Sequence, residues 1–471
     1  MSSAGVPEVQ VPQSGEVTPI IELSVTSEGL LDRLPSYLPS PELLAEYDGP
    51  KSLDVKRRAA FRKKYPGCDY AALHHEGKML IVPAWHPLNT VPPIHHGADY
   101  GSGVFEGGSA EPVVRNGKLV GANIILLKDK MRRMFGKSLP SREFKLEESP
   151  SDFTQVLIDL VAAHGSRLYM GPKGIKRAYI RPVARPAHDN GLGVGVPEGA
   201  SADAVIEPFY WPSYVDDPET VYHGTGAIAE ALPAQRLQPI EGKDSSNYGP
   251  SGPLTKKAKK LGGTEALLFA PFTSRNGERG ETVLLDQDYK RKGRDVMEIM
   301  PDLSLADGPG EEIAVVNEDL KQLWVLPMDV NRLGGTTLEH VRNYIAPQLD
   351  LTVVERTFSL NELREAQNMG HKVAPIFVGN AIRICPIGQI NMRDEKSNLK
   401  GSLEFEIPDT VRRMQEIYEA QVSGQVDSGN PELLTPINLA DGNAARRQLD
   451  ALYADWFEPE YLAETQRLMA A

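Results

Sequence analysis

The sequence predicts an α+β protein with at least two domains, and three observations support this fold class. The chain has 471 residues, of which 41% are hydrophobic, which is enough to build more than one core of ordinary size. Short apolar runs at residues 79–82 and 124–127 are typical of strands, and the spacing of apolar residues over 153–164 is typical of a helix. Strand-like and helix-like segments continue to alternate to the end of the chain.

The first part of the chain predicts little regular structure. Residues 1–25 are rich in Ser, Pro, Glu and Val without periodicity, so we expect a mobile arm. Leucines interrupted by prolines over 27–65 predict short helices. The basic run KRRAAFRKK at 56–64 is better explained as a solvated helix face than as a phosphate site.

Further elements follow in order. A strand predicted at 178–182 leads into the glycine-rich stretch HDNGLGVGV at 188–196, which predicts a loop. That stretch has neither the spacing nor the Lys-Ser/Thr ending of a nucleotide-binding loop. A connection is expected at 215–220, and helical spacing recurs within 430–471. Between them the pattern predicts one helix and three strands, at 253–260, 266–269, 313–316 and 323–326.

The composition excludes several classes of function. A net charge of −13 disfavours a nucleic acid partner, because most of the surface would repel a polyanion. Cys68 and Cys385 are too far apart for a short zinc motif, and the paired histidines at 74–75 and 95–96 lack completing ligands, so no metal is expected. No basic leader and no run of about 18 apolar residues occurs, which predicts a cytoplasmic protein without membrane spans.

One lysine is a candidate for covalent chemistry. Lys243 lies in EGKDSSNYGPSG, where a loop meets a predicted helix, with Asn247 and Tyr248 just after it. A catalytic lysine needs neighbours that tune its amine, since a free ammonium is not nucleophilic. Taken alone, the segment fits a solvent-exposed lysine better.

Several other segments change that balance because they occur together and in order. They are YGSGVFEGG at 100–108, Arg133 within LLKDKMRRMFGKS, AYIRP with Tyr179 and Arg181, WPSY with Trp211 and Tyr214, and Lys243-x-x-x-Asn247-Tyr248. In this order they resemble the fold-type IV pyridoxal phosphate enzymes, most closely the branched-chain amino acid aminotransferases. The resemblance covers roughly residues 94–390.

The resemblance implies an architecture. We expect a small α/β domain and a larger pseudo-barrel α/β domain, with pyridoxal 5'-phosphate between them. It also implies a homodimer in which the loop around 191–194 reaches the neighbouring subunit. The expected division is a 1–69 N-terminal extension, a 70–207 small domain, a 208–222 connection, a 223–428 cofactor-binding domain and a 429–471 helical appendage.

The resemblance also implies roles for individual residues. Lys243 would hold the cofactor as an imine and carry protons, Arg133 would bind its phosphate, and Tyr248 would contact its phenolic oxygen. Tyr179 and Arg181 would hold the substrate carboxylate. The expected remainder of the substrate pocket consists of Tyr100, Phe105, Trp211, Tyr214 and Ala381.

Three positions depart from the family pattern. In ADGPGEE at 306–312, Asp307 replaces the glutamate expected to face the pyridine nitrogen. In LGGTTLEH, Thr336 and Thr337 would serve the phosphate through an N–H group and a hydroxyl, although the arginine usual there is absent. Asn380 stands where a threonine is usual and is expected to keep the turn and to contact the cofactor.

These features predict transfer of an amino group from an aliphatic or related L-amino acid to a 2-oxo acid such as 2-oxoglutarate. The departures leave a second reading open, in which the same cofactor serves a lyase, decarboxylase or cyclising reaction on a specialised amino acid, since a fold alone does not determine a reaction. A non-catalytic binding protein is a third reading. The retained lysine, arginines and Tyr248 argue against it.

Overall fold

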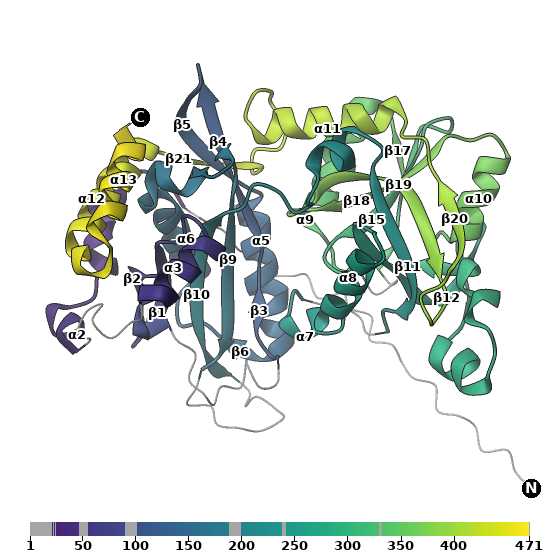
Figure 1. Cartoon of the computed structure of the whole chain (residues 1–471), viewed down its shortest axis with the longest axis horizontal. Coiled ribbons are helices and arrows are strands. Elements are labelled where there is room, and N and C mark those ends of the chain that lie inside the picture. The colour runs from purple at the N-terminus through teal and green to yellow at the C-terminus, as the bar shows by residue number, and fades with distance from the viewer. Residues whose placement is uncertain are drawn as a thin grey trace, which may run out of the picture.

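The structure is a computed structural model, and it describes residues 21, 23, 25–46, 55–89, 101–187, 199–237, 242–328 and 332–470. Two separate sheets divide it into two halves (Figure 1). Among the described residues no helix is long and apolar enough to cross a membrane. Tyr100, the loop at 191–194 and the histidines at 95–96 lie outside the described residues.

The first sheet has the order β2-β1-β10-β9-β4-β5-β21, with β3 beside β9 and β6 beside β10. Its long strand β10 alternates buried and half-buried positions, the period-two pattern of a strand with one face in a core. The strands are β1 (Tyr70–His75), β2 (Lys78–Pro83), β3 (Val104–Phe105), β4 (Gly108–Arg115), β5 (Lys118–Ile125), β6 (Phe144–Lys145), β9 (Ala178–Pro186), β10 (Ala200–Tyr210) and β21 (Leu434–Ile437). A separate hairpin pairs β7 (Met170–Gly171) with β8 (Gly174–Ile175).

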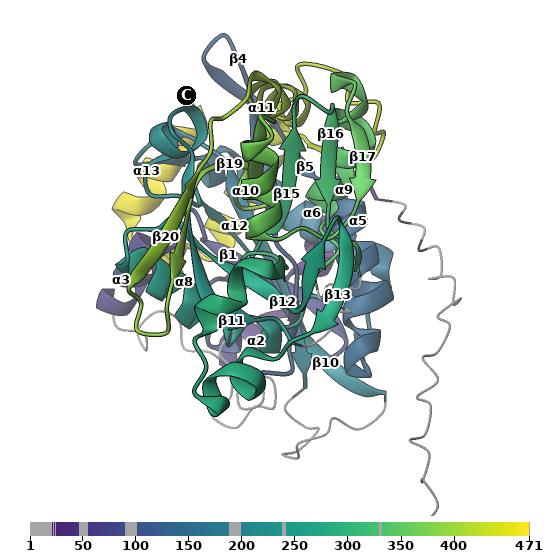
Figure 2. The ribbon, with the colours of Figure 1, turned by 90° about the vertical axis from the view of Figure 1, so that its right-hand side faces the viewer.

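The second sheet has the order β13-β12-β11-β19-β18-β15-β16-β17, with β14 beside β12 and β20 beside β19. It curls, so that β12 and β13 lie below β16 and β17 in Figure 2. The strands are β11 (Ala227–Gln235), β12 (Glu265–Arg275), β13 (Glu278–Thr282), β14 (Leu303–Leu305), β15 (Glu312–Asn317), β16 (Gln322–Val325), β17 (Thr352–Glu355), β18 (Val373–Gly379), β19 (Arg383–Arg393) and β20 (Leu399–Glu404).

Helices cover both sheets. The central helix of the first half is α6, where Ser149 caps the N-terminus by accepting from the Asp152 N–H at 3.1 Å. Phe153, Val156, Leu157 and Leu160 then recur at helical spacing and are buried, as the sequence predicts. The α-helices are α1 (Leu30–Arg33), α2 (Pro41–Glu46), α3 (Val55–Lys64), α5 (Leu127–Arg133), α6 (Pro150–Ala163), α7 (Ser245–Tyr248), α8 (Ser251–Lys260), α9 (Thr336–His340), α10 (Leu360–Asn368), α11 (Asp409–Val422), α12 (Leu439–Leu452) and α13 (Pro459–Ala470).

Most elements expected from the sequence are present, with one shift. The helix expected at 253–260 is α8, and Gly263 donates to the Ala258 carbonyl at 3.0 Å where it ends. The strand expected at 124–127 stops at Ile125, because Leu126 adopts a left-handed backbone with φ 51° and the helix α5 begins at Leu127.

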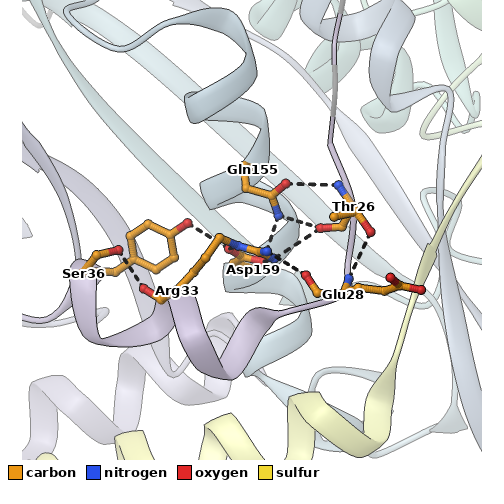
Figure 3. A network of polar contacts seen from close by, with 7 residues as sticks. Thr26, Glu28, Arg33, Ser36, Gln155 and Asp159 are labelled. Carbon is orange, nitrogen blue, oxygen red and sulfur yellow. Dashed lines mark hydrogen bonds and ion pairs between the residues drawn. The ribbon is translucent and has the colours of Figure 1, made fainter.

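Both ends of the described chain pack on the first half. After α11 the chain crosses back, and β21 pairs with β5 before α12 and α13 cover the outer side (Figure 1). Leu449 and Trp456 belong to the same core as α6. The helix α1 is tied to α6 by its last residue, Arg33, which donates from two nitrogens to the Asp159 carboxylate at 2.7 Å each (Figure 3).

Candidate functional site

Lys243 lies where the two halves meet. Its backbone carbonyl accepts from the Phe105 N–H at 3.0 Å, and its own N–H donates to Ser138 Oγ at 2.9 Å. Asp244 forms an isolated bridge with Val104 and caps the short helix α7 by accepting from the Asn247 N–H. The segment that carries Lys243 is therefore held by β3 of the other half.

Two aromatic rings flank the Lys243 amine. The Nζ atom lies 5.4 Å from the ring centroids of both Phe105 and Tyr248, and those rings are 4.9 Å apart. Burial lowers the pKa of Lys243, but Tyr248 and Glu106 raise it by more, so the net pKa lies above its ordinary value.

Arg133 forms the basic side of the site from the C-terminal end of α5. Its Nε and Nη2 donate to the two carboxylate oxygens of Glu106 at 2.8 and 2.7 Å, and its Nη1 donates to the Gly334 carbonyl at 2.7 Å. Glu106 is fully buried. Among the described residues, two of the five guanidinium N–H groups remain beyond these three bonds. Gly335, the next residue after Gly334, is the N-cap of α9, and Thr336 and Thr337 are the first two residues of that helix.

A buried carboxylate paired with an arginine also lines the site. Asp307 is 2.8 Å from Arg236 Nε, and Arg236 Nη2 also donates to the Gly308 carbonyl at 3.0 Å. Burial raises the pKa of Asp307 to about 6, although Arg236 and Arg332 oppose the shift. Near neutral pH, Asp307 can therefore be either protonated or ionised.

Two further acidic residues, Glu311 and Glu312, follow Asp307 in the sequence and also line the cleft. Glu312 forms a buried ion pair with Arg332, and burial still raises its pKa to about 7. Glu311 is also buried, but its Oε1 has no hydrogen-bond partner among the described residues. Three carboxyl groups of the site therefore come from the six residues 307–312.

The aromatic residues expected around the substrate form a chain of contacts. The Tyr179 and Trp211 ring centroids are 4.6 Å apart, and the Trp211 and Tyr214 centroids are 5.9 Å apart. Tyr214 Oη donates to Glu265 Oε2 at 2.7 Å. Arg181 packs over the Phe105 and Tyr179 rings, 5.0 and 5.2 Å from their centroids.

The turn after β18 completes this region. Arg177, which is buried, donates from Nη2 to the Ala381 carbonyl at 2.5 Å and holds the turn from behind. The side-chain nitrogen of Asn380 is buried without a hydrogen-bond partner among the described residues. The turn therefore presents an unused donor.

One cleft of about 700 Å³, part of it open to solvent, brings most of the expected residues together. Four expected residues that the structure describes do not line it. Phe105, Arg181 and Trp211 contact residues that do, and Tyr214 contacts Trp211. The expected residues that do line it are Arg133, Tyr179, Lys243, Tyr248, Asp307, Thr336, Thr337, Asn380 and Ala381.

The sequence alone left out five charged residues of this region. Glu106 stands inside the Phe-Glu-Gly segment, and Glu311 and Glu312 directly follow Asp307, so proximity in sequence was an available signal. The other two are Arg236 and Arg332, which meet Asp307 and Glu312 only through the fold. No local pattern marks them.

Solved structures share this fold. A branched-chain aminotransferase from Thermoproteus uzoniensis, solved with norvaline, is 20% identical, with 78% of this chain and 99% of that chain covered and a TM-score of 0.57. The Escherichia coli branched-chain amino acid aminotransferase is 20% identical, with 79% of this chain and 99% of that chain covered and a TM-score of 0.55. The branched-chain amino acid aminotransferase from Thermobaculum terrenum, solved in its PLP form, is 20% identical, with 78% of this chain and 98% of that chain covered and a TM-score of 0.56.

No protein-family model and no curated protein matches the chain. At 20% identity, the likeness to solved structures establishes the fold. The chain has the fold-type IV architecture of branched-chain aminotransferases, which confirms the fold class that the sequence resemblance predicted.

Proposed function

We propose that this protein is a pyridoxal phosphate-dependent aminotransferase that moves an amino group from an L-amino acid to a 2-oxo acid. The observation that carries the proposal is the cleft itself, where a lysine amine, an arginine and a buried carboxyl group from three separate segments face one space. The T. terrenum neighbour is a PLP form, and the T. uzoniensis neighbour was solved with an amino acid.

The residues present fit this cofactor. Arg133 retains two N–H groups for a phosphate, and the first N–H groups of α9 at Thr336 and Thr337 lie on the same side. Asp307 offers a carboxyl group for the pyridine nitrogen, and Tyr248 offers a phenol for the ring oxygen. Lys243 provides the amine.

Pyridoxal phosphate supplies an electron sink that stabilises negative charge at the substrate Cα. The rest is the work of the chain. Lys243 Nζ accepts the proton from Cα and returns it. Tyr179, which lines the cleft and carries Arg181 packed over its ring, orients the substrate carboxylate. The rings of Phe105 and Tyr248 exclude water from the Lys243 amine. Part of the pocket is proposed to come from a second copy of the chain in a homodimer.

A second candidate keeps the cofactor and changes the reaction to a lyase, decarboxylase or cyclising step. The Asp307–Arg236 pair motivates it, because an arginine on this carboxyl group changes the charge that faces the ring nitrogen, and a fold alone does not determine the reaction. Turnover of an amino acid without any added 2-oxo acid would select this candidate over amino transfer.

The test is direct. Purified protein with pyridoxal phosphate should show a visible absorption band, which an L-amino acid should bleach and 2-oxoglutarate should restore. Lys243→Ala should abolish the band and the activity, while Lys256→Ala, an exposed lysine on α8, should change neither. Failure to bind the cofactor, or a band that no amino acid shifts, would refute the proposal.

A further inference from the structure

Among the described residues, the carboxyl group of Glu311 is buried in the cleft without an ion pair. Its residue is only 6% exposed, and Oε1 has no hydrogen-bond partner among the described residues. The residue lines the same space as Lys243. A buried polar atom without a partner is costly, so it usually meets a ligand or water.

The backbone holds Glu311 beside the turn expected to receive the substrate. Glu312 pairs with Val378 in the β15–β18 register, which puts Glu311 opposite Gly379 and next to Asn380. A Cβ at Gly379 would lie 3.2 Å from the Glu311 Cβ, and one at Gly308 would lie 2.1 Å from Oε1. Because Gly379 and Gly308 have no side chains, the Glu311 side chain can pack close against the turn.

The neighbouring acids already have partners. Asp307 is paired with Arg236, and Glu265 accepts from Tyr214. Glu311 forms no ion pair among the described residues. Burial, together with the Glu265 and Asp307 carboxylates, raises the pKa of Glu311 well above its ordinary value, and Arg236 only partly opposes this. The local field therefore favours a cation or an N–H donor and disfavours an anion.

We propose that Glu311 is a specificity-determining residue that selects a substrate side chain ending in N–H donors, either an ammonium group or a carboxamide. This inference rests on the proposed amino transfer. An aliphatic side chain would seal Oε1 away from water and leave it unpaired. A carboxamide would also give the unused Asn380 side-chain nitrogen an acceptor, whereas an ammonium group would satisfy Glu311 alone.

Three amino donors of matched length separate these cases. Ornithine carries an ammonium group, glutamine a carboxamide, and norleucine a methyl group at the same distance from Cα. In the wild-type holoenzyme we expect kcat/KM for ornithine or glutamine to exceed that for norleucine by about tenfold to a hundredfold, the cost of one buried unpaired group.

Two variants test the residue. Glu311→Leu should remove the preference and raise kcat/KM for norleucine. Glu311→Gln keeps an acceptor without charge, so it should lower the use of ornithine and spare glutamine. Glu281→Leu, an exposed glutamate on β13, is the control and should leave the order unchanged.

The outcomes are distinguishable. An enzyme that binds pyridoxal phosphate and transfers amino groups but prefers norleucine, or whose preference survives Glu311→Leu, would overturn this inference alone. A protein that shows no visible cofactor band would overturn the proposed function, and this inference with it. Equal cofactor absorbance in the wild type and both Glu311 variants establishes that the site remains folded.

Discussion

Neutralising Glu106 tests how this site handles a phosphate. Glu106→Gln keeps the shape of the side chain and removes the charge that two Arg133 nitrogens contact at 2.8 and 2.7 Å. Glu106 is fully buried, and the Arg133 side chain is only 10% exposed, so water replaces the lost partner only in part. The guanidinium is then left as a buried cation without a counter-charge.

The expected cost is large because the pair is buried. Breaking a buried ion pair by removing one partner costs about 3 to 5 kcal/mol, which corresponds to a fall in Tm of roughly 6 to 20 °C for domains of this size. A phosphate dianion beside Arg133 would restore the missing negative charge. Pyridoxal phosphate should therefore narrow the difference in Tm between the variant and the wild type.

The assay is thermal unfolding of both proteins, alone, with pyridoxal phosphate and with pyridoxal, which lacks the phosphate. We expect narrowing only with the phosphorylated compound. Glu432→Gln is the matched control, because Glu432 pairs with the adjacent Arg132 at the surface, at 2.8 Å, and should cost at most about 1 kcal/mol without phosphate dependence. An equal loss of Tm with and without pyridoxal phosphate would refute Arg133 as the phosphate ligand.

Two further measurements address stability. Glu312→Gln removes a carboxyl group whose pKa rises from 4.5 to about 7 on folding. An acid whose pKa is higher in the folded state stabilises the fold fully at pH values below its unfolded-state pKa, and this contribution is lost as pH rises through its folded-state pKa. The free energy of unfolding of the wild type should therefore fall by about 3 kcal/mol relative to that of the variant between pH 4.5 and 8. Chemical denaturation at several pH values checks this, and a difference between the two proteins that does not change with pH contradicts it. Leu449→Ala, fully buried in α12, should cost about 2 to 5 kcal/mol in urea unfolding, whereas Leu452→Ala, 41% exposed on the same helix, should cost under about 1 kcal/mol; equal effects would show that α12 is not part of the first core.

Much of the fold could be predicted because its signals are local. The α6 helix follows from a capping serine and apolar residues at helical spacing, and α8 ends at two glycines. The segment around Lys243 was noticed through its order relative to other segments, and the cleft brings that lysine together with Arg133 and Asp307. These predictions needed only neighbours in sequence or a fixed order along the chain.

Other parts of the site could not be predicted in this way. Arg133 was expected as a phosphate ligand, and its pairing with Glu106 joins residues 27 positions apart that meet only through the fold. Arg236 and Asp307 are 71 positions apart and meet because β12 pairs with both β11 and β14, the strands that precede them. The return of β21 to β5 likewise joins segments more than 300 residues apart.

The sequence by itself determined the fold class, the expected cofactor lysine and the candidate residues around it, because periodicity and ordered motifs are properties of the chain. Only the tertiary structure decided which charges are paired and which are left over. Asp307, Glu311 and Glu312 are three similar acids in one short stretch, yet two have an arginine and Glu311 has none among the described residues. The physical reason is that an ion pair depends on distances across the fold, which residue type and spacing do not encode.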